Sequence, residues 1–242
     1  MRNRLLIVGA AGVAVVLLAG GGVYVYFFSG LRSSPSALGL SATPSPAAIG
    51  TPTSAATGSL AGTWTVTAGS LAGYRVKELF VGETSKHDAV ARTSTVSGTL
   101  TVNGDSSGYQ VTGITFTAAL TDLHSVDSVA GRNVTQRDSY VSRQMNLQQF
   151  PNATFTASSA SVPASSTSGP VDVSAAGKLT IRGVTKDVAA TAKAQLTGGK
   201  IEIAGNLSID MTDYGVSPPS VPFTTVDSQV TIEFDLFLTR PS

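Results

Sequence analysis

Strict alternation of apolar and polar residues constrains this chain more than any other feature. The two longest alternating runs are Ile201–Met211 and Val230–Leu238, and a third is Val96–Val102. Alternation with period two puts the apolar side chains on one face of a β-strand and the polar ones on the other. The chain is therefore expected to consist mainly of antiparallel strands, each with one dry and one wet face.

Shorter segments continue this pattern between turn signals at Asn103–Ser107, Pro163–Pro170 and Thr197–Lys200. They predict further strands over Thr63–Thr67, Tyr74–Leu79, Tyr109–Leu120, Thr154–Val162, Val171–Ile181 and Val188–Leu196. Within Tyr109–Leu120 the apolar phase slips near Gly113, which predicts a β-bulge. Only Arg132–Leu147 lacks a strand pattern, and a short helix is expected there.

About eight antiparallel strands within roughly 180 residues favour a closed all-β meander barrel. Closure removes exposed sheet edges, and a barrel of about eight strands is wide enough to hold one small ligand. Pattern alone leaves a two-sheet sandwich open.

The N-terminal part has a different composition. Met1–Arg4 carries two arginines, and Leu5–Phe28 contains no charged residue. As a helix those residues extend about 36 Å, which is enough to cross a bilayer core roughly 30 Å thick. The arginines favour a cytoplasmic N-terminus. Residues 5–28 are thus predicted to be a single-pass signal anchor of the cytoplasmic membrane, with the rest extracytoplasmic; a cleaved signal peptide is the alternative.

Residues 29–59 are rich in Ser, Pro, Ala, Gly and Thr and contain no aromatic side chain. Such a segment buries too little apolar surface to offset its ordering entropy, so a disordered linker is expected. The remaining residues, 60–242, are expected to form one barrel domain.

Charge and cysteine content exclude several classes of protein. Of 16 basic and 15 acidic residues, Arg2, Arg4 and Arg32 precede residue 60, which leaves the domain slightly acidic. A nearly neutral domain lacks the basic surface needed for nucleic acid. The absence of cysteine excludes disulfides, thiolate metal sites and a cysteine nucleophile. No metal or other cofactor is expected.

Few residues are suited to catalysis. His87 and His124 are both flanked by polar residues and are expected in solvated loops, and no cluster of metal ligands occurs. Asp122 beside His124 does not make a catalytic triad, because adjacent loop residues lack the required geometry. The chain is therefore not expected to be an enzyme.

Six segments, in order, resemble the YceI family: Gly62–Trp64, Tyr74–Glu78, Arg137–Asp138, Phe150–Phe155, Gly177–Lys186 and Asp213–Gly215. The resemblance covers nearly all of the domain, and the anchor and tether are similar to the membrane-anchored actinobacterial members. It implies a lipocalin-like barrel that encloses a polyisoprenoid or similar long-chain amphiphile. Family members can pair as dimers, so the resemblance also implies a possible homodimer. Many members have a His where this chain has Glu78 and an Arg where it has Met211, which leaves the lipid undefined.

Alternation and the resemblance together nominate the residues that line the barrel. These are Trp64, Tyr74, Val76, Phe116, Leu120, Tyr140, Val141, Met145, Phe155, Leu179, Ile181, Leu207, Ile209, Phe234 and Leu236, with Tyr140, Val141 and Met145 as a lid. Candidate head-group contacts are Arg132, Arg137, Arg182 and Lys186; the alternative is that Arg137 is solvated or paired and that Arg182 and Lys186 belong to a plain turn.

Three functions are weighed. The favoured one is a membrane-tethered binding protein that stores or transports an isoprenoid or fatty-acyl lipid. The first alternative is a solidly packed structural protein of the cell envelope without ligand. The second is a lipid-modifying enzyme, which would require polar groups such as His124 with Asp122 or Glu78 to converge in the cavity.

Overall fold

A computed structural model of the chain describes residues 32–41, 60–105, 108–162 and 169–240. Its elements in chain order are β1 (Arg32–Ser33), β2 (Gly62–Val66), β3 (Leu71–Phe80), β4 (His87–Thr93), β5 (Val96–Asp105), β6 (Gly108–Ala119), η1 (Leu120–Asp122), β7 (His124–Ser125), β8 (Ser128–Val129), α2 (Gln136–Gln144), β9 (Asn152–Ala160), β10 (Val171–Ile181), β11 (Val184–Thr197), β12 (Lys200–Asp210), η2 (Met211–Tyr214), β13 (Ser220–Val221) and β14 (Thr224–Thr239).

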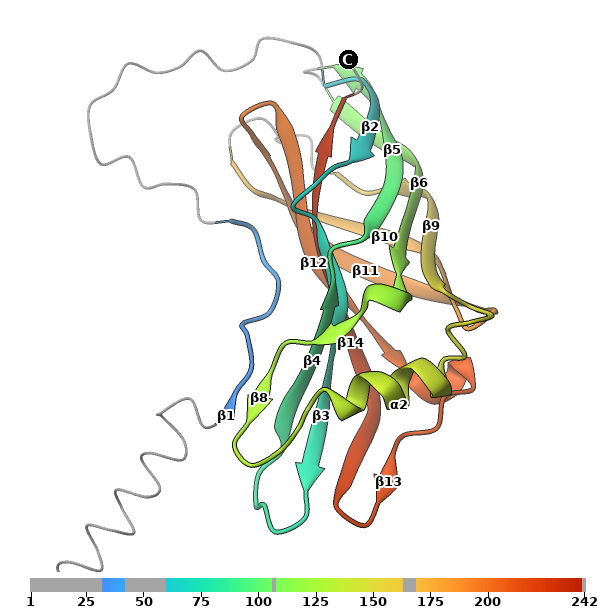
Figure 1. Ribbon diagram of the computed structural model, residues 1–242. Coiled ribbons are helices and arrows are strands. Elements are labelled where there is room, and N and C mark those ends of the chain that lie inside the picture. Colours follow the sequence, from blue (N-terminus) through green and yellow to red (C-terminus); the bar gives the residue numbers. More distant parts are fainter. Residues whose placement is uncertain (1–31, 42–59, 106–107, 163–168, 241–242) are drawn as a thin grey trace, which may run out of the picture.

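Eight of these strands close into one antiparallel barrel. The pairing runs β12-β11-β10-β9-β6-β5-β2-β14, and β12 also pairs with β14, so the last strand returns to the first. β3 and β4 lie beside β14 as extensions of β2 and β5 (Figure 1). The predicted all-β closed barrel is confirmed, and the two-sheet sandwich is excluded.

Two predicted breaks in the strand pattern are also present. The pairing of β5 with β6 shifts register between Thr99 and Thr101, and Gly113, opposite this point, has φ 58°. This left-handed glycine makes the expected β-bulge. Between β10 and β11 the turn is only Arg182–Gly183, with φ of 51° and 75°, as two-residue hairpins with matching twist require.

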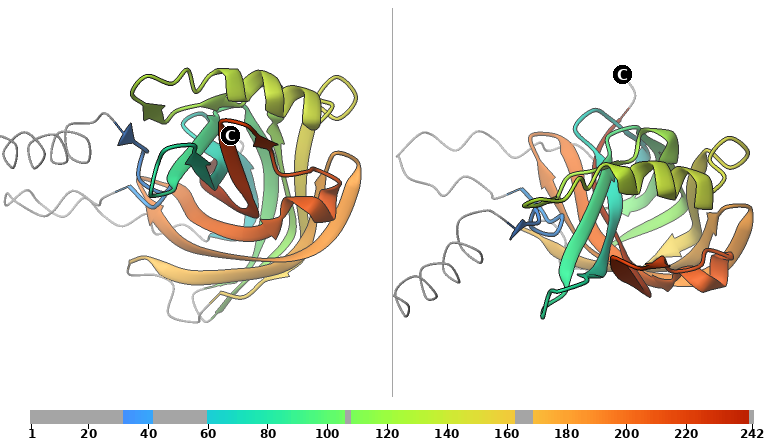
Figure 2. Two further views of the ribbon diagram at one scale, coloured as in Figure 1. Left: turned by 90° about the horizontal axis from the view of Figure 1, so that it is seen from below. Right: turned by 60° about the horizontal axis from the view of Figure 1, so that its bottom comes forward.

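The one α-helix among the described residues, α2, occupies the middle of the Arg132–Leu147 segment predicted to be helical. Asp138 lies in its first turn and Arg143 in its last. Each charge interacts favourably with the helix dipole at its own end. Seen end-on, the strands form a ring and α2 runs along one side of it (Figure 2). We call the part of the barrel that lies next to α2 the α2 end.

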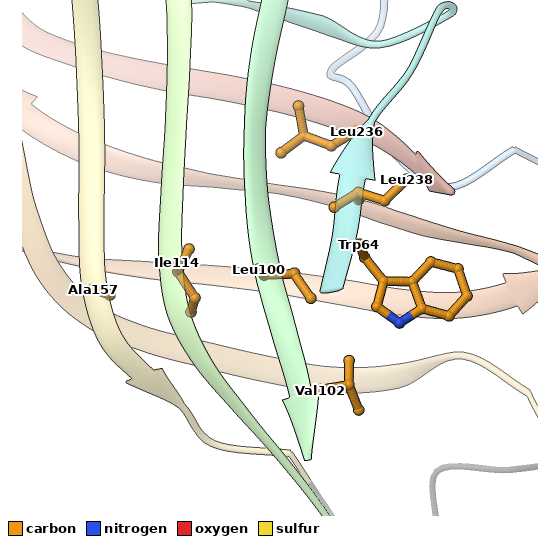
Figure 3. Packing of buried hydrophobic residues seen from close by; sticks show 7 residues of the cluster. All are labelled: Trp64, Leu100, Val102, Ile114, Ala157, Leu236 and Leu238. Carbon is orange, nitrogen blue, oxygen red and sulfur yellow. The ribbon is translucent and has the colours of Figure 1, made fainter. Parts of the chain in front are cut away.

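A compact apolar cluster fills another part of the interior. Trp64 is 1% exposed and Leu238 is fully buried. Around them lie Leu100, Val102, Ile114, Ala157 and Leu236, from β5, β6, β9 and β14 (Figure 3). The indole N–H of Trp64 donates to the carbonyl of Leu60 at 2.9 Å, so its polar atom is satisfied. We call this region the Trp64 end.

Residues 33–41 lie along the outer face of the barrel and are called the strap (blue in Figure 1). Arg75 Nη2 donates to the carbonyl of Pro35 at 2.8 Å, and Arg92 Nη2 donates to that of Ser36 at 2.6 Å. The backbone N–H of Ser41 donates to Glu202 Oε1 at 2.6 Å.

This docking differs from the linker expected over residues 29–59. That expectation rested on apolar burial, whereas the strap is held by charge-assisted hydrogen bonds to its backbone, which composition does not reveal.

No helix in the described ranges is long and apolar enough to cross a bilayer. The predicted anchor, residues 5–28, and the remainder of the predicted linker lie outside those ranges.

Candidate functional site

Two cavities occupy the barrel interior. One, of about 220 Å³, lies toward the Trp64 end, and the other, of about 180 Å³, lies under α2. Both are lined by Ala72, Ala118, Ala153, Leu179 and Ile232, so they adjoin at a common waist. Each is more than ten times the roughly 10–15 Å³ that one water molecule needs. The barrel therefore encloses an elongated space.

Small side chains leave this space open. On β11 the inward positions Ala190, Ala192 and Ala194 line the first cavity, and Ala175 on β10 faces them. Ala189, next to Ala190 on the same strand, is exposed, as alternation requires. An eight-stranded barrel is just wide enough either to be filled by side chains or to hold one small ligand. A run of alanines on one inward face removes that filling.

The structure places fourteen of the fifteen predicted lining residues on the cavities. Phe116, Phe155, Leu207, Phe234 and Leu236 line the first cavity, Leu179 lines both, and the second is lined by Tyr74, Val76, Leu120, Tyr140, Val141, Met145, Ile181 and Ile209. Trp64 is different, because it is packed within the buried cluster and reaches neither cavity. Alternation identifies inward-facing residues but does not tell a filled interior from a hollow one.

A buried ionic network joins α2 to the barrel wall. Arg137 of α2 donates to Asp127 Oδ1 at 2.7 Å and to Glu78 Oε2 at 2.6 Å. His87 Nε2 lies 2.7 Å from Asp127 Oδ2, and the backbone N–H of Val90 donates to Oδ1 at 3.0 Å. Glu78, His87 and Asp127 are each about 5% exposed. This Arg137 network fixes the helix over the second cavity.

The network also sets the protonation of its members. Burial alone would raise the pKa of Asp127, but hydrogen bonds from His87, Arg137 and Val90 lower it to about 2. Burial likewise opposes the charge on Arg137, yet the two carboxylates raise its pKa. Burial raises the pKa of Tyr74, which lines the second cavity. Asp127 and Arg137 are therefore both charged at neutral pH, and the phenol of Tyr74 is neutral.

Comparison with known proteins identifies the fold's family. Residues 64–238 match the YceI-like domain model. The chain belongs to the YceI-like family. A polyisoprenoid-binding domain from Saccharophagus degradans, implicated in plant cell wall breakdown, is similar with TM-score 0.51 and 16% identity, over 74% of this chain and 98% of that one. None of the curated proteins matches.

Two further solved structures resemble this YceI-like chain less well. BcnA from Burkholderia cenocepacia has 18% identity and TM-score 0.47, covering 68% of this chain and 95% of its own. A YceI protein from Campylobacter jejuni has 16% identity and TM-score 0.43, with coverages of 69% and 86%.

The four candidate head-group residues of this YceI-like domain are not brought together. Arg137 lines the second cavity, but its guanidinium is already engaged by two carboxylates. Arg132 is exposed and stacks over the ring of Phe80, 4.9 Å from its centroid. Arg182 donates to the carbonyl of Gly215 at 2.9 Å, and Lys186 is exposed; neither lines a cavity. The Arg182–Gly183 segment is a plain hairpin turn.

Both histidines were predicted to be exposed to solvent, and this is confirmed for one and wrong for the other. His124 is exposed in β7, as expected, but His87 is buried at the start of β4 against Asp127. Its polar neighbours in sequence suggested a loop, whereas its burial depends on a carboxylate forty residues later. His124 and Asp122 line neither cavity, and within the described residues no group of His, Asp and Glu is suited to a metal.

The buried ion pair of Glu78 was not predicted from the sequence, although a signal for it was present. Glu78 follows Tyr74 and Val76 in the same alternating phase, so alternation predicts that its carboxylate faces inward. An inward carboxylate needs a buried cationic partner. The structure shows that Arg137 on α2 is this partner.

Proposed function

We propose that this YceI-like protein encloses the apolar chain of a long amphiphile, either polyisoprenoid or fatty-acyl, for storage or transport. The observation that carries the proposal is the pair of adjoining cavities lined almost entirely by apolar side chains. The fold is shared with a polyisoprenoid-binding domain, which is consistent with such a ligand. Binding of this kind needs apolar lining and no catalytic group.

The energetics favour an occupied interior. Each methylene moved from water into the cavity contributes about 0.8 kcal/mol before association costs. A ligand that threads both cavities therefore gains more than one confined to either.

The polar end of the ligand is expected at the α2 end. Thr93, Arg137 and Gln144 are polar groups on the second cavity, and Arg137 is its one charged lining residue among those described. Because Glu78 and Asp127 already neutralise Arg137, an anionic head group gains little there. A neutral or weakly polar head group fits this end better than a phosphate.

We also propose that the domain is held at the outer surface of the cytoplasmic membrane. The apolar stretch Leu5–Phe28 and the preceding arginines support a single-pass anchor. A carrier of lipid gains from this placement, because its ligand is supplied by the same bilayer.

Native mass spectrometry of the full chain, purified from its own membrane, tests lipid enclosure. We expect a co-purifying mass that an organic solvent extracts. Ala190→Phe fills the first cavity and should reduce the bound fraction at least tenfold, whereas Ala189→Phe, on the exposed face of the same strand, should not. Bare wild-type protein together with unchanged unfolding on addition of long-chain lipids would instead support a ligand-free envelope barrel.

A further inference from the structure

Two large apolar side chains stand exposed at the α2 end of the barrel. Val81, just after β3, is 64% exposed, and Phe223, in the β13–β14 turn, is 58% exposed. The backbone N–H of Val81 donates to the carbonyl of Phe223 at 3.0 Å, so the two loop tips touch. Both hairpins project beyond α2 at the lower end of Figure 1. Val81 and Phe223, the apolar tip, thus form one small apolar projection.

The strap enters the domain at this same end. β1 pairs with β8 through Arg32 with Val129 and Ser33 with Ser128, and Ser33 Oγ lies 2.8 Å from Ser128 Oγ. Three residues after Val129, the guanidinium of Arg132 stacks over Phe80, the residue before Val81. A short series of contacts therefore connects the start of the strap to the apolar tip.

From that entry point the strap runs away from the apolar tip. Ser34 Oγ donates to the carbonyl of Asp88 at 2.6 Å, and Ser41 reaches Glu202 on β12. Glu202 pairs with Phe237, near the end of β14 that also pairs with β2. The strap thus has a fixed direction along the barrel, with its N-terminal end at the α2 end.

The length of chain before the strap sets how far the domain stands from a membrane. Only three residues separate Phe28, the end of the apolar stretch, from Arg32. At 3.3–3.6 Å per residue, the backbone of Arg32 stays within about 14 Å of the end of that stretch. This step rests on the proposed membrane anchor.

We propose that the apolar tip docks into the bilayer surface and that the α2 end of the barrel faces the lipid. Two apolar side chains bind a membrane weakly on their own. Because Arg32 stays within about 14 Å of the surface and contacts connect it to the apolar tip, the tip acts at a high effective concentration, so weak insertion is enough. The second cavity and its helix then face the bilayer, and a lipid chain passes between membrane and barrel without crossing water.

Site-specific labelling of the full chain in phosphatidylcholine vesicles tests the docking. The chain has no cysteine, so Phe223→Cys and Thr197→Cys each give one site for an environment-sensitive fluorophore. Thr197 is the control, because it is exposed beside the β11–β12 turn and lines neither cavity. We expect quenching by headgroup-proximal spin-labelled lipid to be at least threefold stronger at 223. Equal quenching at both sites would overturn the proposal.

Two insertions test whether the strap sets the orientation. Twenty Gly/Ser residues inserted between Ser29 and Gly30 lengthen the tether before the strap, and the same insertion between Ser59 and Leu60 lengthens the chain after it. Only the first should weaken quenching at 223, by twofold or more. Equal effects of the two insertions would show that the strap does not hold the domain to the surface.

These outcomes separate docking from lipid enclosure. Strong quenching at 223 in protein that retains no ligand would support docking and contradict the proposed carrier function. Bound ligand with equal quenching at 223 and 197 would support the carrier function and contradict docking. Protein that fails to float with the vesicles would remove the anchor and overturn the docking proposal.

Discussion

The two ends of the barrel interior are closed by different kinds of interaction. At the Trp64 end, seven buried apolar side chains from neighbouring strands pack together. At the α2 end, one arginine on a helix is clamped between two buried carboxylates of the wall. Apolar packing has no preferred direction and is lost only when the strands separate. The Arg137 network has fixed geometry and joins one short helix to the barrel, so it can break while the barrel stays closed.

This contrast assigns separate tasks to the two ends. The Trp64 cluster stabilises the closed barrel, and the Arg137 network holds the helix that covers the second cavity. Ligand exchange is then expected at the α2 end, through local opening of α2 and not through unfolding of the barrel.

The largest effect is expected from Trp64→Ala. It removes the biggest fully buried side chain and leaves a cavity among Leu100, Leu236 and Leu238. Such truncations cost about 3–5 kcal/mol of unfolding free energy. Urea denaturation followed by circular dichroism measures it, and Trp64→Phe should cost clearly less. A loss below about 1 kcal/mol would show that this end is not the stabilising one.

Arg137→Met should cost about 3 kcal/mol, because Glu78 and Asp127 are left buried without their cation. Hydrogen exchange should speed up across Gln136–Gln144 while amides around Trp64 remain protected. Adding Glu78→Gln should recover part of the loss. Arg132→Met, which alters only an exposed stacking contact, is the control. Equal loss of protection at both ends would contradict local opening.

Closing the waist should separate the two cavities without opening either end. Ala118 and Ala153 are paired across β6 and β9 and line both cavities. Replacing both with Leu should weaken binding of long-chain lipids by about 2 kcal/mol, roughly 30-fold, since several methylenes lose their place. Short chains should bind as before in a fluorescent-lipid displacement assay. Thr156→Leu, on the outer face of β9, should change neither.

The smallest effect, about 1 kcal/mol, is expected from Asp235→Asn on the outer face. Burial, aided by nearby Glu202, raises the pKa of Asp235 to about 6. A carboxyl whose pKa is higher folded than unfolded makes the protein less stable as pH rises from about 4 to 6. The substitution should remove this slope and stabilise the protein at pH 7–8.

At the α2 end, Asp127 contributes a dependence of stability on pH that has the opposite sign. Its pKa falls to about 2 in the folded state, so its contribution is present above about pH 4 and is lost between pH 4 and 2. Thermal melts from pH 2 to 8 resolve both slopes. A wild-type stability that does not fall between pH 4 and 6 would contradict the assignment to Asp235.

Local patterns predicted most of the barrel. Alternation placed Leu207, Ile209 and Phe234 inward, and the slip at Gly113 identified the bulge. Both signals lie within one strand and follow directly from the two-residue repeat of β-structure. A turn joining two strands was also expected near Arg182–Thr185, and the structure narrows it to Arg182–Gly183.

What the sequence did not reveal depends on contacts between distant residues. His87 is buried because Asp127 faces it, and the strap is docked because Arg75 and Arg92 reach its carbonyls. Neither set of contacts produces a periodic pattern in the sequence. Trp64 shows a different limit: its inward position was predictable, but whether it fills space or borders it depends on the volumes of all its neighbours.

The pairing of β14 also has a consequence for how the chain is made. β14 pairs with β12 on one side and with β2 and β3 on the other, so the last sixteen-residue strand joins the two ends of the sheet. Until those residues leave the ribosome, β3 and β12 each present an unpaired edge. Such edges bind other strands readily, and contacts between residues so far apart in sequence form slowly. A nascent chain is therefore expected to be prone to aggregation until β14 has been synthesised and has paired.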